Sequence, residues 1–289
     1  MLETGDLLQR VRKIEIKTRG LSKNIFAGEY HSVFKGRGMA FSEVREYQYG
    51  DPIRDIDWNV TARFNKPYVK VFEEERELTV MLLIDMSASQ SLGSRMRTKR
   101  EYIAEIAAVL SFSAIQNNDK IGVILFSDSV EKFIPPQKGR KHILRVIREI
   151  LEFSPQSSGT HIPNVLQFFT NAIKRRCTAF LISDFADTTP LYDSLSIANK
   201  KHDVMAIRVF DGLEEEMPNV GFVRIRDVES GKEMWVNTAQ KSVRAKISEQ
   251  YQLRVQKLEY TFVRAGVDNI AVQPNKDYVV PLMQLFKKR

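Results

Sequence analysis

Cysteine, histidine and long apolar runs are all scarce in this chain of 289 residues. Its one cysteine, Cys177, cannot form an internal disulfide and lies beside an apolar run, so we expect a buried, inert thiol and not a nucleophile. The apolar runs fall far short of the roughly 20 residues of a membrane-spanning helix, and the N-terminus lacks the apolar stretch of a signal peptide. We therefore expect a cytoplasmic protein with no integral membrane segment.

Several catalytic motifs are also missing. The sequence contains no phosphate-binding Gly-x-x-x-x-Gly-Lys-Ser/Thr loop, no Gly-x-Ser-x-Gly elbow, no His-Glu-x-x-His pair and no Gly-x-Gly-x-x-Gly turn. The four histidines are scattered: His31, His142, His161 and His202. We interpret His161 as a loop or helix-start residue, because no partner that would fix its tautomer for general-base work can be named. These absences favour a binding protein over an enzyme.

The formal charge of +8 does not by itself predict a nucleic-acid-binding protein. Basic and acidic residues are interleaved, as in residues 73–77, and no focused phosphate-binding stripe is visible, so we expect no DNA partner. The most basic stretch, residues 10–23, overlaps an apolar pattern typical of an amphipathic helix. We interpret it as a helix packed on the body, with weak contact to an anionic membrane surface or to RNA as the alternative.

The chain divides into three regions that differ in composition and in the pattern of apolar residues. Residues 1–76 combine the leading helix with an extended part rich in Gly, Arg and Asp, and we expect this segment to pack on the core. Residues 77–212 form the main domain, because 43% hydrophobic residues in a chain of this length can bury a large core. Residues 213–289 complete the domain with a hairpin around Ser230-Gly231, a long helix at about 239–264, a strand near 270–272 and a terminal helix near 278–288.

The middle region alternates apolar runs with helical patterns. We expect strands at 78–85, 120–126, 178–183 and 204–210, and helices at 98–116, 141–152 and 164–175. The strand runs are continuously apolar, which indicates burial on both faces of a sheet. This rhythm predicts an α/β fold with a mostly parallel sheet and helices on both faces.

Polar side chains gather where these strands end. Five of them carry oxygen: Asp85, Ser87, Ser89, Thr160 and Asp184. The first three form an Asp-x-Ser-x-Ser loop, Thr160 opens a helix, and Asp184 follows another strand. Because ligands of parallel α/β sheets bind at the carboxyl ends of the strands, we expect these side chains to share one edge. Carboxylates and hydroxyls suit Mg²⁺ and not zinc, although each residue could instead serve only as a cap.

The ordered set resembles the metal ion-dependent adhesion site (MIDAS) of von Willebrand factor A domains. The resemblance implies a von Willebrand factor A-like, or Rossmann-like, fold. It also implies that the five residues hold a divalent cation directly or through water. Mg²⁺ is the first expectation, with Mn²⁺ or Ca²⁺ as alternatives. An acidic side chain of a partner would then complete the coordination shell.

A narrower resemblance covers nearly the whole chain. The segments Phe34-Lys35-Gly36-Arg37-Gly38, Val44-Arg45-Glu46-Tyr47 and Tyr49-Gly50-Asp51-Pro52-Ile53-Arg54-Asp55-Ile56-Asp57-Trp58 are similar to the signature of the bacterial DUF58 family. Thr61-Ala62-Arg63 and Pro67-Tyr68-Val69-Lys70 continue the pattern. That family has a core similar to von Willebrand factor A domains. Its members are often associated with MoxR-type AAA+ ATPases, which implies such an ATPase, or its client protein, as the partner.

The signature segment mixes arginines with aspartates, and Gly50-Asp51-Pro52 has the composition of a turn. Planar guanidinium groups form bidentate pairs with carboxylates and can fasten an extended segment to another surface. We interpret the segment as an internal clamp on the sheet with Trp58 as its apolar anchor, and a partner-binding surface is the alternative.

Three functions therefore stay open at the level of sequence. The favoured hypothesis is a metal-dependent protein-binding module that serves as an adaptor of a MoxR-type ATPase in protein assembly or maturation. A metal-dependent hydrolase and a nucleic-acid-binding protein are the alternatives. A hydrolase would usually have a denser group of carboxylates than one Asp after each of two strands.

Overall fold

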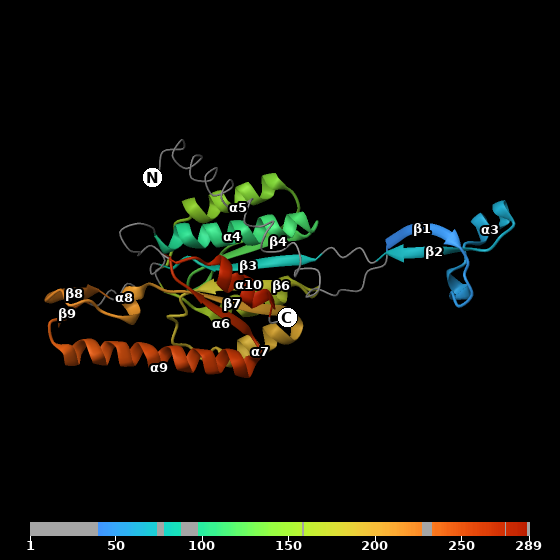
Figure 1. Cartoon of the computed structure of the whole chain (residues 1–289). Helices are drawn as coiled ribbons and strands as arrows, with labels where there is room; N and C mark the ends of the chain where they lie inside the picture. The colour runs from blue at the N-terminus through green and yellow to red at the C-terminus, as the bar shows by residue number, and fades with distance from the viewer. Residues whose placement is uncertain are drawn as a thin grey trace. The chain divides into compact units, whose positions relative to one another are not determined.

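The computed structural model describes residues 40–73, 78–87, 98–157, 159–226, 233–274 and 276–287. These residues form two compact units, one within residues 34–77 and one within residues 78–289 (Figure 1). The predicted leading helix lies outside the described residues, as does Ser89. The packing of residues 1–76 on the core stays a prediction.

The small unit is a two-stranded antiparallel sheet with short helices. Its elements are β1 (Ala40–Glu46), the 3-10 helix η1 (Ile53–Asp55), α3 (Trp58–Phe64) and β2 (Tyr68–Glu73). Arg45 makes the bidentate pair that the sequence suggested, with both guanidinium nitrogens 2.7–2.9 Å from the carboxylate of Asp51. Asp57 caps α3 by accepting hydrogen bonds from the amides of Asn59 and Val60. Polar interactions therefore fix the turn and the helix of this unit.

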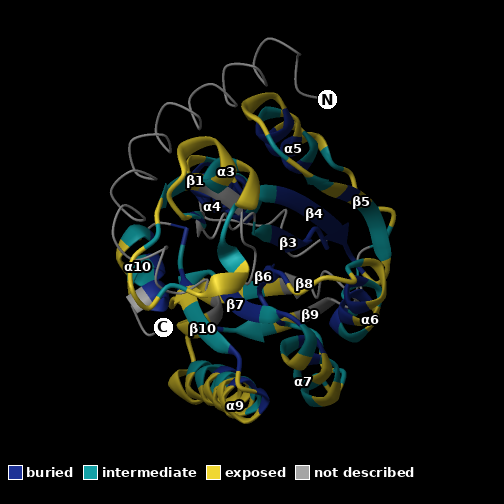
Figure 2. Cartoon of the chain, turned by 90° about the vertical axis from the view of Figure 1, so that its right-hand side faces the viewer, coloured by how far each residue is buried: buried dark blue, intermediate teal, exposed yellow. Residues whose placement is uncertain are grey.

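The large unit is built on a six-stranded sheet in the order β10-β7-β6-β3-β4-β5. Its strands are β3 (Thr79–Asp85), β4 (Lys120–Phe126), β5 (Val130–Gln137), β6 (Thr178–Ser183), β7 (Asp203–Val209) and β10 (Asp268–Val272). All neighbours pair in parallel except β4 and β5. The central strands are buried on both faces, as the dark blue ribbon of Figure 2 shows, and this accounts for their continuous apolar sequences.

Helices cover both faces of this sheet, which confirms the predicted α/β fold (Figures 1 and 2). One layer holds α4 (Lys99–Gln116), α5 (Arg140–Glu152) and α10 (Val279–Lys287), and the other holds α6 (Ile162–Ala172), α7 (Tyr192–Lys201) and α9 (Lys241–Ala265). The short α8 (Gly212–Glu215) precedes the hairpin of β8 (Phe222–Arg226) and β9 (Glu233–Asn237). The hairpin, the long helix, the strand and the final helix of the third region were all predicted.

Three elements of the large unit were not predicted: the short helix α8, the strand β5 and the helix α7. The edge strand β5 contains Pro135 and Pro136, which lack the backbone N–H of a regular strand and are tolerated at an edge. The helix α7 is short, and only Leu195 and Ala198 of its residues are buried, so its apolar periodicity is weak.

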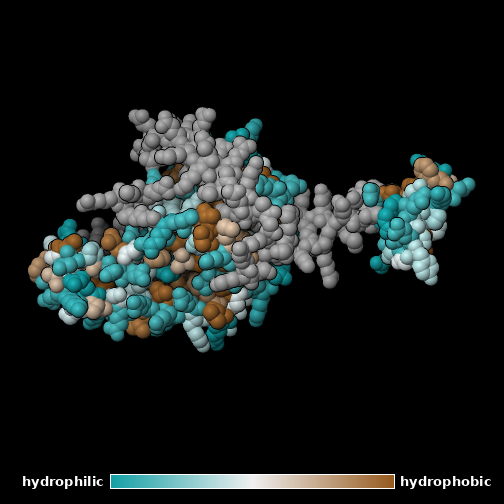
Figure 3. Space-filling model, viewed as in Figure 1, coloured by the Kyte–Doolittle hydropathy of each residue, from teal (hydrophilic) through white to brown (hydrophobic). Residues whose placement is uncertain are grey.

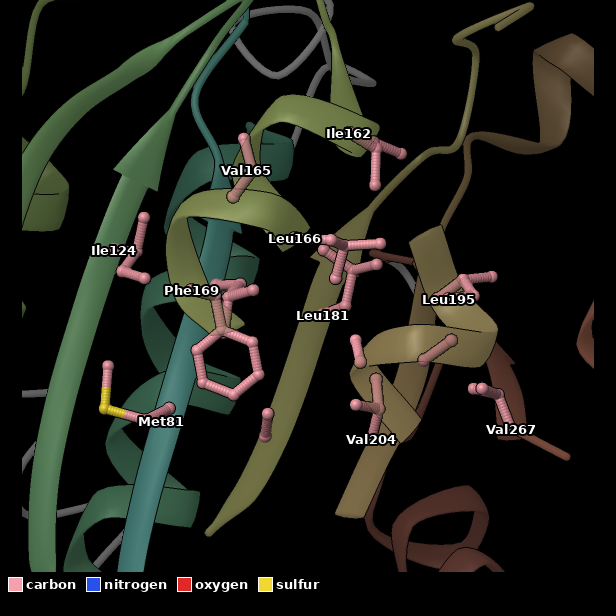
Figure 4. Packing of buried hydrophobic residues seen from close by; sticks show 14 of the residues in the cluster. Met81, Ile124, Ile162, Val165, Leu166, Phe169, Leu181, Leu195, Val204 and Val267 are labelled. Atoms are coloured by element: carbon pink, nitrogen blue, oxygen red, sulfur yellow. The ribbon is translucent and has the colours of Figure 1, made fainter. Parts of the chain in front are cut away.

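Side chains of the sheet interlock with α6 and α7 to form a continuous core. Figure 4 shows Leu166 and Phe169 of α6 beside Leu181 of the sheet, and Leu195 of α7 belongs to the same buried cluster. Full burial of an aliphatic or aromatic side chain contributes about 1.5–3 kcal/mol. The core therefore fixes the positions of β3 and β6, whose carboxyl ends carry the predicted site.

Candidate functional site

The strand order of the sheet changes direction between the neighbouring strands β3 and β6. From β3 the chain continues to β4 on one side, and it later returns to place β6 on the other side. In α/β sheets such a switch point leaves a crevice at the carboxyl ends of the two strands, where ligands bind. Asp85 is the last residue of β3, and Asp184 directly follows β6. The two predicted carboxylates thus lie at the switch point.

Asp85 is completely buried and held in one orientation. One of its oxygens, Oδ1, accepts a hydrogen bond from the amide of Ser87 at 2.9 Å, and Oδ2 accepts one from the hydroxyl of Ser183 at 2.6 Å. Burial raises the pKa of the Asp85 carboxyl well above its usual range, and the neighbouring charge of Asp184 raises it further. The two carboxylates are therefore close enough to repel each other, and a cation between them would relieve that repulsion.

Asp184 is buried beside a lysine that the sequence did not single out. Lys99, in the first turn of α4, places its Nζ atom 3.5 Å from Oδ2 of Asp184, and both side chains are almost fully buried. The amide of Ala186 donates to Oδ1 of Asp184 at 3.2 Å. The ammonium group offsets part of the negative charge that the two aspartates bring to this edge of the sheet.

The loop that carries Thr160 is fastened to the loop after Asp184. The amide of Ile162, two residues beyond Thr160, donates to Oδ2 of Asp187 at 2.9 Å. The amide of His161 donates to the carbonyl of Ser127, which follows β4, at 3.0 Å. These bonds bring the segments after β4, before α6 and after β6 together at one edge. Thr160 itself has a buried Oγ1 atom without a hydrogen-bond partner among the residues that the structure describes.

The backbone bends sharply directly after Asp184. Phe185 has φ of 55°, a left-handed conformation that is costly for a bulky residue. Its ring is buried and meets the ring of Phe262 on α9 edge-on, with centroids 5.1 Å apart. Packing thus maintains a strained conformation beside the candidate site, which is where such strain tends to occur in proteins.

The described residues of the predicted set fit a small divalent cation. All of their donors are oxygen atoms, two are carboxylates close to each other, and the Thr160 hydroxyl, which no other described residue bonds, needs a ligand or a water molecule. Within the described residues no cluster of three or more His, Cys, Asp or Glu side chains suits a metal. A cation at this edge would therefore depend on hydroxyl groups as well as on the two carboxylates.

Sequence reasoning missed two residues of this edge. Ser183 could have been found, because it is a polar residue at the end of an apolar strand and directly precedes Asp184. Lys99 carries no local signal, since the sequence between Asp85 and Lys99 shows no apolar pattern that would place it near that aspartate. His161 is a helix-start residue as interpreted: its Nδ1 atom accepts a hydrogen bond from the amide of Asn164 and caps α6.

Cys177 has a histidine neighbour that the sequence did not reveal. The Sγ atom lies 3.3 Å from Nδ1 of His202, and both side chains are buried. Burial raises the pKa of the Cys177 thiol to about 12 and lowers the pKa of His202 to about 4. Both groups are therefore neutral near pH 7, and the expected inert thiol agrees with this geometry, because nucleophilic cysteines react as thiolates.

Helices long and apolar enough to cross a membrane do not occur among the described residues.

Comparison with known proteins gives distant relatives. The chain is 26% identical over 292 aligned residues to the protein named "Uncharacterized protein Rv1480" of Mycobacterium tuberculosis, covering all of this chain and 91% of that protein.

Among solved structures, the protein BatB from Bacteroides thetaiotaomicron aligns with a TM-score of 0.49 at 15% identity, over 73% of this chain and 98% of BatB. The SpRpn10 VWA domain aligns with a TM-score of 0.40 at 11% identity, over 72% of this chain and 94% of the domain. The family described as "Protein of unknown function DUF58" matches residues 43–257. Because this match spans most of the chain, the protein belongs to the DUF58 family.

Proposed function

We propose that the chain is a divalent-cation-dependent protein-binding module and not an enzyme. One observation carries the proposal: Asp85 and Asp184 are buried at the carboxyl ends of the neighbouring strands β3 and β6, and the loop of Thr160, whose hydroxyl has no hydrogen-bond partner among the described residues, is bonded to the same edge of the sheet. Mg²⁺ is the proposed cation, with Mn²⁺ or Ca²⁺ as alternatives. Its proposed ligands are Asp85, Ser87, Thr160, Asp184 and, from the sequence pattern alone, Ser89.

The donor set explains why binding is proposed instead of catalysis. Neutral hydroxyl ligands leave a divalent cation with unbalanced positive charge, so a carboxylate from a partner would be a strong and specific ligand. Ser183 and the amide of Ser87 orient Asp85, while Lys99 and the amide of Ala186 orient Asp184. The chain's own residues thus hold the edge rigid before a partner arrives, which lowers the entropic cost of association.

The proposed partner is a MoxR-type AAA+ ATPase or a client protein that such an ATPase handles. The support is the resemblance of the signature segment, and an acidic side chain on the partner would make the central contact. We propose a cytoplasmic location on the same basis, because an ATPase partner depends on ATP. The chain would then act as an adaptor in protein assembly or maturation.

Surface plasmon resonance with the purified ATPase tests this function. Binding should occur with Mg²⁺ and fail in excess chelator, and Asp85→Ala should speed dissociation, since the metal-bridged contact is made in the docked complex. Asp193→Ala, which removes an exposed carboxylate on α7, is the matched control and should bind as the wild type does. An unchanged complex in chelator would refute the metal bridge, and metal-dependent turnover of a phosphoester would favour the hydrolase.

A further inference from the structure

A groove of about 520 Å³ lies between α9 and the loop that connects β6 to α7. One wall is formed by residues 187–191 of the loop, and the other by residues on one face of α9 between Gln250 and Thr261. Ile162, at the start of α6, and Phe185 complete the lining. Figure 2 shows α7 and α9 side by side on the same side of the sheet. The volume is that of sites that accept a few side chains of a ligand.

The groove is continuous in sequence with the candidate metal site. Phe185 directly follows Asp184, and Ile162 lies two residues after Thr160, so both segments that line the groove also carry proposed ligands. The Phe185 ring contacts Phe262 and fastens the loop to α9. The amide of Ile162 bonded to Asp187 fastens the same loop to α6. The groove is therefore held in shape by contacts of the folded chain.

The walls of the groove are apolar and basic. Leu253 and Leu258 of α9 face it together with Leu191 of the loop, and Leu253 remains half exposed. Arg254 and Lys257 of α9 also line it and place positive charge beside these leucines. An exposed apolar side chain next to two cations favours a ligand that is itself apolar and acidic.

The acidic residue in the lining is already engaged by the chain. Asp187 accepts hydrogen bonds from the amide of Ile162 at 2.9 Å, from the amide of Thr189 at 2.8 Å and from the hydroxyl of Thr189 at 2.7 Å. Its carboxylate therefore stabilises the wall and has little capacity left for a ligand. The lining also offers a ligand the leucines, the ammonium group of Lys257 and the hydroxyl of Thr188, while the Thr261 hydroxyl donates to the carbonyl of Lys257 at 2.8 Å.

We propose that this groove binds an extended acidic segment of a partner protein, in which a leucine-like side chain packs on Leu253 and Leu258 while a carboxylate contacts Lys257. A second acidic residue of the same segment would reach the candidate metal site, and only this last contact rests on the proposed function. The recognition is that of a short peptide with alternating acidic and apolar residues. Two anchoring regions on one surface give such a peptide both direction and register.

Fluorescence anisotropy with a labelled synthetic peptide of alternating glutamate and leucine tests the proposal. The wild-type chain should bind it and should reject two matched peptides, one with lysine for each glutamate and one with serine for each leucine. Lys257→Glu should weaken binding by about tenfold or more, because a favourable charge contact becomes a repulsive one. Lys241→Glu makes the same charge change at an exposed position outside the lining, at the start of α9, and should have a small effect.

A second variant and a chelator separate the groove from the metal site. Leu253→Ser should weaken the glutamate–leucine peptide without altering divalent-cation binding measured by calorimetry. In excess chelator the affinity should fall, and the residual binding should still respond to Lys257→Glu. If chelator and Asp85→Ala change nothing while Lys257→Glu still weakens binding, the groove stands and the metal bridge is wrong.

Four results would overturn the groove proposal, three with the peptides and one with a small molecule. The first is that the glutamate–leucine peptide does not bind, and the second is that the lysine peptide binds equally well. The third is that Lys257→Glu and Leu253→Ser both keep the wild-type affinity for the glutamate–leucine peptide while calorimetry still detects divalent-cation binding. Binding of N-acetylglutamate alone as tightly as the peptide would also overturn it, because the site would then take a small molecule. Circular dichroism of each variant verifies that the substitution leaves the fold intact.

Discussion

The large unit and the small unit are stabilised by different interactions. In the large unit, strands such as β3 and β6 are buried on both faces, and even the polar residues at their ends are enclosed. In the small unit, Val69 is the one apolar residue that is buried among the residues whose burial the structure describes. Polar bonds, such as the pair of Arg45 with Asp51, organise the rest of it.

The difference shows where each unit can place apolar side chains. Tyr49, Ile53, Trp58 and Phe64 of the small unit are mostly exposed within it, and Figure 3 shows hydrophobic residues at its surface beside hydrophilic ones. A segment of this size cannot bury enough apolar surface to form a core of its own. Its exposed aromatic rings therefore do not contribute to a core within the unit. In the predicted clamp they would pack against another surface.

A matched pair of phenylalanine substitutions tests the comparison with the largest expected effect. Phe180→Ala should lower the free energy of unfolding by about 3–5 kcal/mol, because Phe180 is buried in β6 and its ring contacts that of Phe286. Phe64→Ala should cost less than about 0.5 kcal/mol, since its side chain is largely exposed. Urea unfolding measures both. Equal losses would break the comparison and favour the clamp, with Phe64 buried against another surface.

A pair of lysine substitutions contrasts a buried ion pair with an exposed one. Lys99→Met should lower the free energy of unfolding by about 3 kcal/mol in chelator, since it leaves the buried charge of Asp184 without its cation. Lys66→Met, which breaks an exposed pair with Glu46 in the small unit, should cost less than about 1 kcal/mol. Denaturation in chelator measures the difference. A Lys99→Met variant as stable as the wild type would show that Asp184 is not charged in the fold.

The pH dependence of the free energy of unfolding also distinguishes the two units, with a smaller expected effect than the substitutions above. His202 has a pKa of about 4 in the fold against 6.5 when unfolded, chiefly because it is buried. The unfolded chain therefore binds the extra proton, and stability is full above about 6.5 and falls as the pH drops toward 4. The loss between pH 7 and pH 5 should be about 2 kcal/mol. His202→Gln should flatten this slope in chemical denaturation at several pH values.

The half-buried carboxylate of Asp51 serves as the contrast for His202. The hydrogen bond from Arg45 lowers the pKa of Asp51 below its ordinary value of 3.8, so its contribution is present above that pH and lost only in stronger acid. Asp51→Asn should leave the slope between pH 5 and pH 7 unchanged. If the pH dependence of stability persists in His202→Gln and disappears in Asp51→Asn, it arises in the small unit, contrary to the prediction.

The elements predicted correctly are those whose sequences reflect burial directly. The strands β3, β4, β6 and β7 were found because both of their faces are covered, which leaves only apolar residues in the middle of each. The strand β5 was missed because its two prolines and its exposed face remove both the β pattern and the strand propensity. The helix α7 has a mixed polar sequence, and its place depends on packing with α6 and α9.

The parts of the candidate site that could be predicted are those fixed by strand ends. Asp85 and Asp184 terminate recognisable apolar runs, so their common edge follows from a parallel sheet. The position of Lys99 depends on the exact start of α4 and on its packing against the sheet, and neither leaves a local pattern. The groove joins Phe185 and Lys257, which are far apart in the chain, so only the folded structure could show it.

The prolines of β5 have a consequence for how this protein assembles. An exposed sheet edge is a template on which a strand of another molecule can continue the hydrogen-bonded ladder. Pro135 and Pro136 remove two consecutive N–H groups from β5, and because successive N–H groups of a strand point to opposite sides, one of the missing donors belongs to the free edge of the six-stranded sheet. A neighbouring copy therefore cannot extend the sheet regularly past β5. Contacts with other proteins at this edge must instead use side chains. Side-chain contacts can distinguish one partner from another, whereas backbone pairing accepts any strand.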